Sequence, residues 1–136
     1  MKQIITGISV IFLFIILGNA CAKKEDTELK SIKTNSIYGN WSRIGFENNN
    51  VIFVRTKNLT TDGYGLSFME DGSFIERKNA GWCGTPPVSY DNYKGNWKAI
   101  NDSTLAINVT YWGGMMKYKL VLKAMKQDTL TAEFVY

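Results

Sequence analysis

From residue 36 onward, apolar and polar side chains alternate along the chain, and the period of an amphipathic helix is absent. Between residues 116 and 122 four large apolar side chains share one face, and Lys117 and Lys119 lie on the other. The four are Met116, Tyr118, Leu120 and Leu122. The stretches 104–110 and 129–136 alternate in the same way. Strands with one apolar and one polar face are typical of antiparallel sheets, so the pattern predicts an all-β domain.

Short turn-forming segments divide this part of the chain into expected strands. Asp71-Gly72 is the strongest hairpin signal. In the register that we prefer, residues 70–72 form a three-residue loop with Gly72 in the left-handed region, and Phe68 faces Phe74. A two-residue loop would place these phenylalanines on opposite faces. The expected strands are 38–46, 50–57, 64–69, 72–78, 92–100, 103–110, 115–124 and 128–136.

Eight short strands with local connections predict an antiparallel up-and-down barrel, which leaves no exposed sheet edge. A two-sheet β-sandwich is the alternative. The interior of such a barrel is filled by side chains or holds one small ligand. In the preferred register Glu76 shares the inner face with Phe74. A buried carboxylate requires a partner, and we expect Arg43 or Arg55, unless Glu76 lies at the rim and reaches water.

The first 36 residues have a different composition. One lysine precedes an apolar run over residues 4–17, which is shorter than the roughly 20 residues of a membrane-spanning helix and matches the core of a signal peptide. Small residues follow at 18 and 20, and Cys21 comes next. We expect a signal peptide at 1–20, a charged tether at 21–36 and the barrel domain at 37–136. Ordinary cleavage that leaves Cys21 as a thiol, or an uncleaved anchor, are the alternatives.

Cys21 directly after this boundary resembles the lipobox of bacterial lipoproteins, in which the cysteine is lipidated and becomes the first residue of the mature chain. The resemblance implies a membrane attachment through a lipid on Cys21. Lys24-Glu25-Asp26 is similar to the surface-export signal of Bacteroidetes lipoproteins. Together these resemblances imply an outer-membrane lipoprotein that faces the periplasm or the cell surface.

Gly39-Asn40-Trp41 resembles the Gly-x-Trp signature at the start of lipocalins, in which the tryptophan closes one end of the barrel. Residues 68–74 are similar to the central hairpin of small bacterial lipocalin-like lipoproteins. The resemblance implies a lipocalin-like barrel more than any defined activity. In that family a late arginine stacks on the tryptophan. No arginine follows Arg77 here, so we expect Lys123 or Lys126 to cover Trp41.

The composition narrows the chemistry. A chain of 136 residues is one ordinary domain. The sequence has no histidine, which excludes Ser/His and Cys/His relays and the usual zinc sites. A formal net charge of +4 is too small to indicate a nucleic-acid partner. Glu76 has no second acid–base group at a useful spacing, so we expect no catalytic residue. Asp62-Gly63 and Asp71-Gly72 lack the spacing of a calcium loop, so we expect no metal site, and we expect no cofactor.

The longest segment without an expected strand is 79–91, and long loops of small barrels often carry function. We expect a small apolar or amphipathic ligand at the barrel mouth, contacted by Trp82, Tyr90, Trp112 and Tyr118. Trp82 could instead plug a filled barrel that acts through its outer surface as a protein-interaction or envelope-assembly component. For this alternative the sequence does not identify the protein partner. We expect Cys83 to be a buried apolar residue. The outward lysines of 116–123 are expected to protect a sheet edge and favour solubility.

Overall fold

The computed structural model describes residues 36–81 and 85–136. Eight strands are formed: β1 (Gly39–Glu47), β2 (Asn50–Thr56), β3 (Gly65–Phe68), β4 (Ser73–Asn79), β5 (Tyr90–Asn101), β6 (Thr104–Tyr111), β7 (Gly114–Lys126) and β8 (Thr129–Val135). The prediction of eight strands is confirmed, with every boundary within one or two residues. No helix in the described ranges has the length and apolarity needed to cross a membrane.

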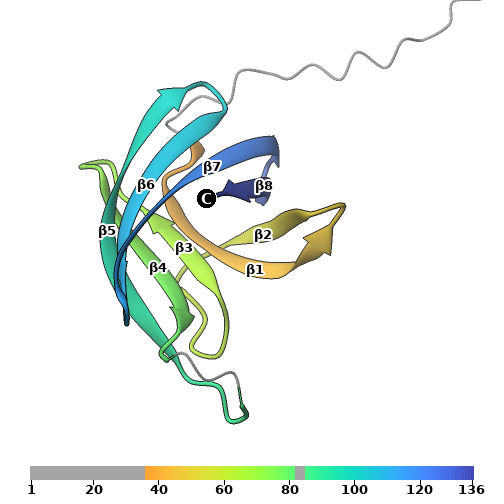
Figure 1. Cartoon of the computed structure of the whole chain (residues 1–136). Helices are drawn as coiled ribbons and strands as arrows, with labels where there is room; N and C mark the ends of the chain where they lie inside the picture. Colours follow the sequence, from red (N-terminus) through yellow and green to blue (C-terminus); the bar gives the residue numbers. More distant parts are fainter. Residues whose placement is uncertain (1–35, 82–84) are drawn as a thin grey trace, which may run out of the picture.

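The strands close into a barrel in the order β1-β2-β8-β7-β6-β5-β4-β3, and every neighbouring pair is antiparallel (Figure 1). Closure confirms the predicted barrel over the sandwich. One connection differs from a simple hairpin, because β3 lies beside β1 and β2 lies beside β8. The segment 57–64 therefore carries the chain past β1. Asn40 Nδ2 donates a hydrogen bond to the Lys57 carbonyl at 2.8 Å, and the Arg43 amide donates to the Tyr64 carbonyl at 2.9 Å.

The β3–β4 hairpin has the predicted register. Gly72 has a φ of +83°, and Phe68 faces Phe74 across the two strands. The two rings lie 5.0 Å apart between centroids, which is a favourable distance for an aromatic pair. The Asp71 carboxylate accepts hydrogen bonds from the Ser73 amide and hydroxyl. Left-handed Gly72 and this local bonding fix the turn, and the turn fixes which faces of β3 and β4 point inward.

The apolar faces predicted from alternation form the core. Its largest fully buried side chains are Trp41, Phe53, Phe68, Phe74, Ile37 and Leu66. The tripeptide Gly-Asn-Trp occurs at residues 39–41 and again at 95–97. Both tryptophans are buried, but their indole N–H groups bond to different carbonyls. Trp41 Nε1 donates to the Ile37 carbonyl at 2.7 Å, and Trp97 Nε1 donates to the Met69 carbonyl at 3.0 Å.

Arg55 on β2 covers Trp41, with its guanidinium carbon 4.2 Å from the ring centroid. The expectation that Lys123 or Lys126 would do so is wrong. Lys123 instead forms an ion pair with Glu133 at 2.6 Å, and Lys126 is exposed. Arg55 is the residue in contact because β2 is paired with β1 in the register Trp41↔Arg55. An alternation pattern assigns faces of strands but not their neighbours.

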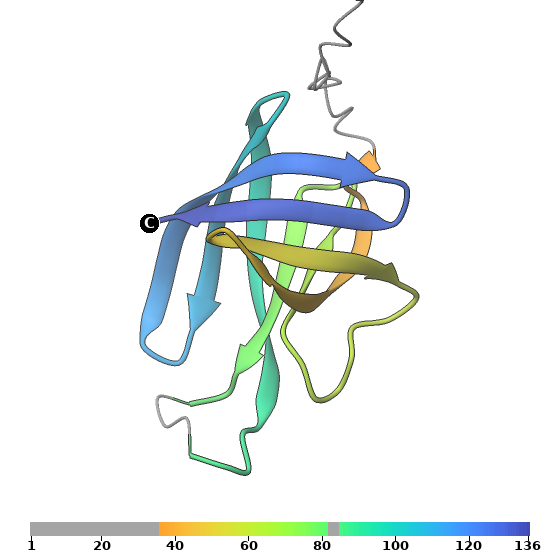
Figure 2. The same ribbon diagram turned by 90° about the vertical axis from the view of Figure 1, so that its right-hand side faces the viewer.

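The two ends of the barrel differ. The pairs Glu47↔Asn50, Asn79↔Tyr90 and Tyr111↔Gly114 place the β1–β2, β4–β5 and β6–β7 connections at one end, which we call the mouth. Figure 2 shows the β4–β5 connection projecting beyond the barrel on the side of the β6–β7 turn. The described chain begins at the opposite end, where Arg55 covers Trp41.

Candidate ligand site at the barrel mouth

A pocket of about 380 Å³ opens at the mouth. Its walls come from β1, β2, β4, β7, β8 and the residue before β3. The side chains that line it include Arg43, Tyr64, Glu76, Lys78, Met116 and Phe134. The volume falls within the range of about 300–1,000 Å³ that small-molecule sites occupy.

The pocket exists because the barrel wall is incomplete at this end. β8 pairs with β7 as far as Val135, but it pairs with β2 only over residues 129–132. Beyond Ala132 the β1–β2 hairpin and β8 are therefore not joined by ladder pairs. β1 also has an irregular register between Arg43 and Gly45, and such irregularities bend a strand. The pocket opens at this gap, against the inner face of β4 and β7.

The apolar part of the pocket is an aromatic cluster. The Tyr64 ring packs against Phe53 and Phe134 at centroid distances of 6.2 Å in both cases. Phe134 also packs against Tyr118 at 5.3 Å and lies 6.4 Å from Tyr136. These rings are held by several contacts each, so they form a stable apolar surface on which a ligand could pack.

The polar part of the pocket is a buried ion pair. Glu76 is only 3% exposed. Its Oε1 accepts a hydrogen bond from the Tyr64 hydroxyl at 2.5 Å, and its Oε2 accepts one from Lys78 Nζ at 3.0 Å. The inward position of Glu76 is as predicted, but the expected partners Arg43 and Arg55 are wrong. Lys78 is the partner because side chains two residues apart on a strand point to the same face.

Arg43 stands at the rim of the pocket. Its guanidinium carbon lies 5.1 Å from the ring centroids of both Tyr64 and Phe46. Cation–π contacts of this kind hold the side chain in place without neutralising its charge. Within residues 36–81 and 85–136 no ion pair involves Arg43, so its charge is available to an anionic group of a ligand.

Burial in this cluster keeps the tyrosine hydroxyls protonated. Burial raises the pKa of Tyr64 well above its usual value, and the nearby Tyr118 and Glu76 raise it further. Burial and the Glu76 charge also raise the pKa values of Tyr118 and Tyr136. The Tyr118 side chain is 4% exposed, and its hydroxyl has no hydrogen-bond partner of good geometry in the described part of the chain. The Glu76 carboxylate and the Tyr64 hydroxyl lie beside the Tyr118 hydroxyl, so Tyr118 belongs to the same buried polar cluster.

The predicted ligand residues do not come together as a group. Tyr118 lies on the inner face, beside the aromatic cluster. Tyr90 is the first residue of β5, and its carbonyl accepts a hydrogen bond from Arg77 Nη2 at 3.3 Å. Trp112 is 58% exposed in the β6–β7 turn and packs edge-on against Tyr111. None of Tyr90, Trp112 and Tyr118 lines the mouth pocket.

Several predictions lie outside the described residues. They concern the signal peptide at 1–20, lipidation of Cys21, the tether before residue 36, Trp82 and Cys83. These remain predictions. In the described ranges no group of three His, Cys, Asp or Glu residues is placed to hold a metal ion.

The sequence interpretation missed most of the pocket residues. Lys78 could have been found, because it has the same parity as Glu76 on one strand. Met116 and Phe134 were expected on apolar faces but not at an opening. Tyr64 precedes β3 in a connection, where alternation carries no information about direction.

Comparison with known proteins yields no family model, curated protein or solved structure that matches the chain. The functional argument therefore rests on the geometry of the barrel itself.

Proposed function

We propose that this protein is a non-catalytic binding protein that holds a small apolar or amphipathic molecule in the mouth pocket. The observation that carries the proposal is the junction of the Tyr64–Phe134 aromatic surface with the buried Glu76–Lys78 pair in one cavity. A buried ion pair is often no more stable than apolar side chains of similar volume. Its presence in an apolar barrel is explained if it orients the polar group of a ligand.

The chemistry of the pocket favours an amphipathic ligand with a hydrogen-bond acceptor or a negative charge. Glu76 already accepts two hydrogen bonds, whereas the Lys78 ammonium group has further N–H donors. Arg43 adds a cation at the rim. The acceptor group would lie near these donors, and the apolar body would pack on Met116 and Phe134, giving burial with a few orienting polar contacts.

We also propose that the chain is an exported lipocalin-like lipoprotein of the outer membrane, anchored through Cys21 and facing the periplasm or the cell surface. The pattern of residues 1–21 and the Lys24-Glu25-Asp26 segment support this location. The barrel fold is compatible with it, because eight-stranded barrels can enclose one small ligand.

Native mass spectrometry of the full chain in non-ionic micelles, after exposure to an envelope lipid extract, tests the binding proposal. Met116 and Met115 provide a matched pair of variants, since Met116 lines the pocket and its neighbour Met115 is exposed. We expect a discrete adduct on the wild type and on Met115→Trp, and its loss on Met116→Trp. An adduct that survives Met116→Trp would contradict the proposed position.

The alternative function is a filled barrel that acts through its outer surface on a protein partner. The continuous buried core that includes Trp41 and Trp97 favours this alternative, because side chains fill that part of the barrel interior. A bare mass for wild type and both variants, under conditions where a known lipid-binding barrel takes up lipid, would favour this alternative. Crosslinking in envelope preparations would then identify the partner.

A further inference from the structure

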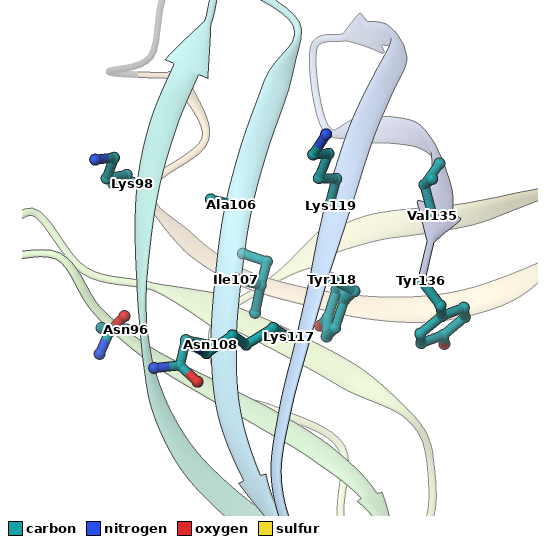
Figure 3. A pocket seen from close by; sticks show the side chains of 10 residues that line it. All are labelled: Asn96, Lys98, Ala106, Ile107, Asn108, Lys117, Tyr118, Lys119, Val135 and Tyr136. Atoms are coloured by element: carbon teal, nitrogen blue, oxygen red, sulfur yellow. The ribbon is translucent and has the colours of Figure 1, made fainter.

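A second hollow, of about 490 Å³, lies on the outer face of β5, β6, β7 and β8 (Figure 3). We call it the lysine groove. The side chains that shape it are Asn96, Lys98, Ala106, Asn108, Lys117 and Lys119. These outward positions alternate with core residues, such as Trp97 and Ile107, along the same strands.

Strand register arranges these side chains in two rows. In one row Ala106 lies between Lys98 and Lys119. Neighbouring strands are about 4.8 Å apart, so the two lysines are anchored roughly 10 Å from each other with a methyl group between them. Figure 3 shows the short Ala106 side chain on β6, between Lys98 on β5 and Lys119 on β7.

The second row is polar. It consists of Asn108 between Asn96 and Lys117. The Asn108 Oδ1 atom is shielded from solvent and has no hydrogen-bond partner within residues 36–81 and 85–136. An unpaired buried oxygen is costly unless something donates to it. The row therefore lacks a hydrogen-bond donor, which a bound molecule could supply.

The charge of the groove is not balanced within the described barrel. Lys98, Lys117 and Lys119 are exposed, and no ion pair between described residues involves them. Glu133, on the adjacent β8, pairs with Lys123 instead. Edge protection does not explain these lysines, because Lys119 lies on a strand that is paired on both sides. Grouped like charges without a counter-charge indicate an anionic partner.

An aromatic ring completes the groove at one end. Tyr136 also lines it and is 82% exposed, while its ring packs against Tyr118 at a centroid distance of 5.7 Å. A simple carboxylate or a phosphodiester would satisfy the lysines but has no hydrogen-bond donor for Asn108 at neutral pH. A sugar offers hydroxyl donors and acceptors for the two amides and an apolar face for the tyrosine ring.

We propose that the lysine groove binds an acidic saccharide, a sugar chain that carries carboxylate groups. Its carboxylates lie between Lys98 and Lys119, and its hydroxyls bond to Asn96 and Asn108. The groove shares Tyr136 with the mouth pocket, but its lysines and amides lie on the outside of the barrel wall. The proposal does not depend on ligand binding at the mouth.

Isothermal titration calorimetry of the full chain in non-ionic micelles, with trigalacturonic acid as the probe, tests the proposal. We expect saturable binding that weakens with salt, since the lysines are exposed to solvent. The Lys98→Gln/Lys119→Gln pair should weaken binding by about tenfold or more, equivalent to about 1.4 kcal/mol. The control pair Lys57→Gln/Lys126→Gln removes the same charge outside the groove and should change binding less than about twofold.

A second variant and two further probes complete the test. Asn96→Ala should weaken binding of trigalacturonic acid, whereas neutral galactotriose should not bind. Equal effects of the two lysine pairs would reduce the interaction to net charge and overturn the proposal. Binding of triglutamate as tight as that of trigalacturonate, or no binding of the saccharide to a folded wild-type chain, would also overturn it. Circular dichroism confirms that each variant is folded.

Discussion

The guanidinium of Arg55 lies over the indole of Trp41, with its carbon 4.2 Å from the ring centroid, and closes the barrel at the end opposite the mouth. The same side chain donates hydrogen bonds to the carbonyls of Tyr38 and Ser36 at 2.5 and 2.7 Å. Its Nε lies 3.4 Å from Asp128 Oδ1. One residue of β2 thus connects the start of the described chain, β1 and the turn before β8.

Replacing Arg55 by Met should lower the free energy of unfolding by about 2–4 kcal/mol, because a cation–π contact and two charged hydrogen bonds are lost. Arg55→Lys should recover less than half of this, since an ammonium group lacks the planar fork. Denaturant unfolding measures both. Lys57→Met, on an exposed side chain just after β2, is the control and should change stability by less than about 0.5 kcal/mol.

The hairpin turn predicts a contrast between two glycines. Gly72 has a φ of +83°, which costs a residue with a Cβ about 1–2 kcal/mol, and we expect Gly72→Ala to lower stability by that amount. A Cβ on Gly45 would meet no atom within 4 Å, and its φ is not in the left-handed region. Gly45→Ala should therefore be nearly neutral in thermal unfolding. If Gly72→Ala lowered the stability no more than Gly45→Ala does, and both were close to wild type, the turn would not require left-handed geometry at residue 72.

The sequence pattern predicted much of this architecture, because alternation and turn residues are local signals. The faces of β6, β7 and β8 and the Phe68–Phe74 register followed from it. The exchange of neighbours that puts β2 beside β8 did not, since strand pairing depends on contacts between distant segments. The contact of Arg55 with Trp41 was missed for the same reason.

The candidate site was less predictable than the fold. The sequence directed attention to aromatic residues in turns, such as Tyr90 and Trp112, whereas the mouth pocket uses residues inside the barrel wall. The wall opens where β8 continues beyond its last pair with β2, at Ala132. No residue type in the sequence marks that point. Glu76 was the useful signal, because a charge at an inward position indicated a polar site within the core.

The buried ion pair makes a prediction about stability. Lys78→Met leaves the Glu76 carboxylate without its cation, and we expect a loss of about 3 kcal/mol, the lower end for breaking a buried pair, since Lys78 is partly exposed. Adding Glu76→Gln removes the unpaired charge, so the double variant should recover at least half of that loss. Urea unfolding at pH 7 measures this. Equal stability of the single and double variants would mean that the pair is not electrostatically coupled.

The buried tyrosines make the barrel sensitive to alkali. The pKa values of Tyr64 and Tyr118 are raised in the folded state, whereas tyrosines of the unfolded chain ionise near pH 10. Their contribution to stability is therefore fully present below about pH 10 and is lost as the pH rises above it. We expect Tyr118→Phe to shift alkaline unfolding, followed by circular dichroism, to higher pH.

Ultraviolet titration provides the control for this pH dependence. Tyr118→Phe should remove one phenol that ionises only as the barrel unfolds, whereas Tyr90→Phe, at the start of β5, should leave the unfolding pH unchanged. Ionisation of Tyr118 near pH 10 with the barrel still folded would contradict the buried cluster.

Occupancy of the mouth pocket by a ligand can be measured by methyl NMR of the full chain with ¹³C-labelled methionines. Met116 lines the pocket and Met115 points outward on the same strand. Titration with anilinonaphthalene sulfonate, an apolar aromatic anion, should move the Met116 methyl signal in a saturable way and leave Met115 unchanged. Saturable shifts at Met115 with none at Met116, or no shift at either methyl, would contradict the account.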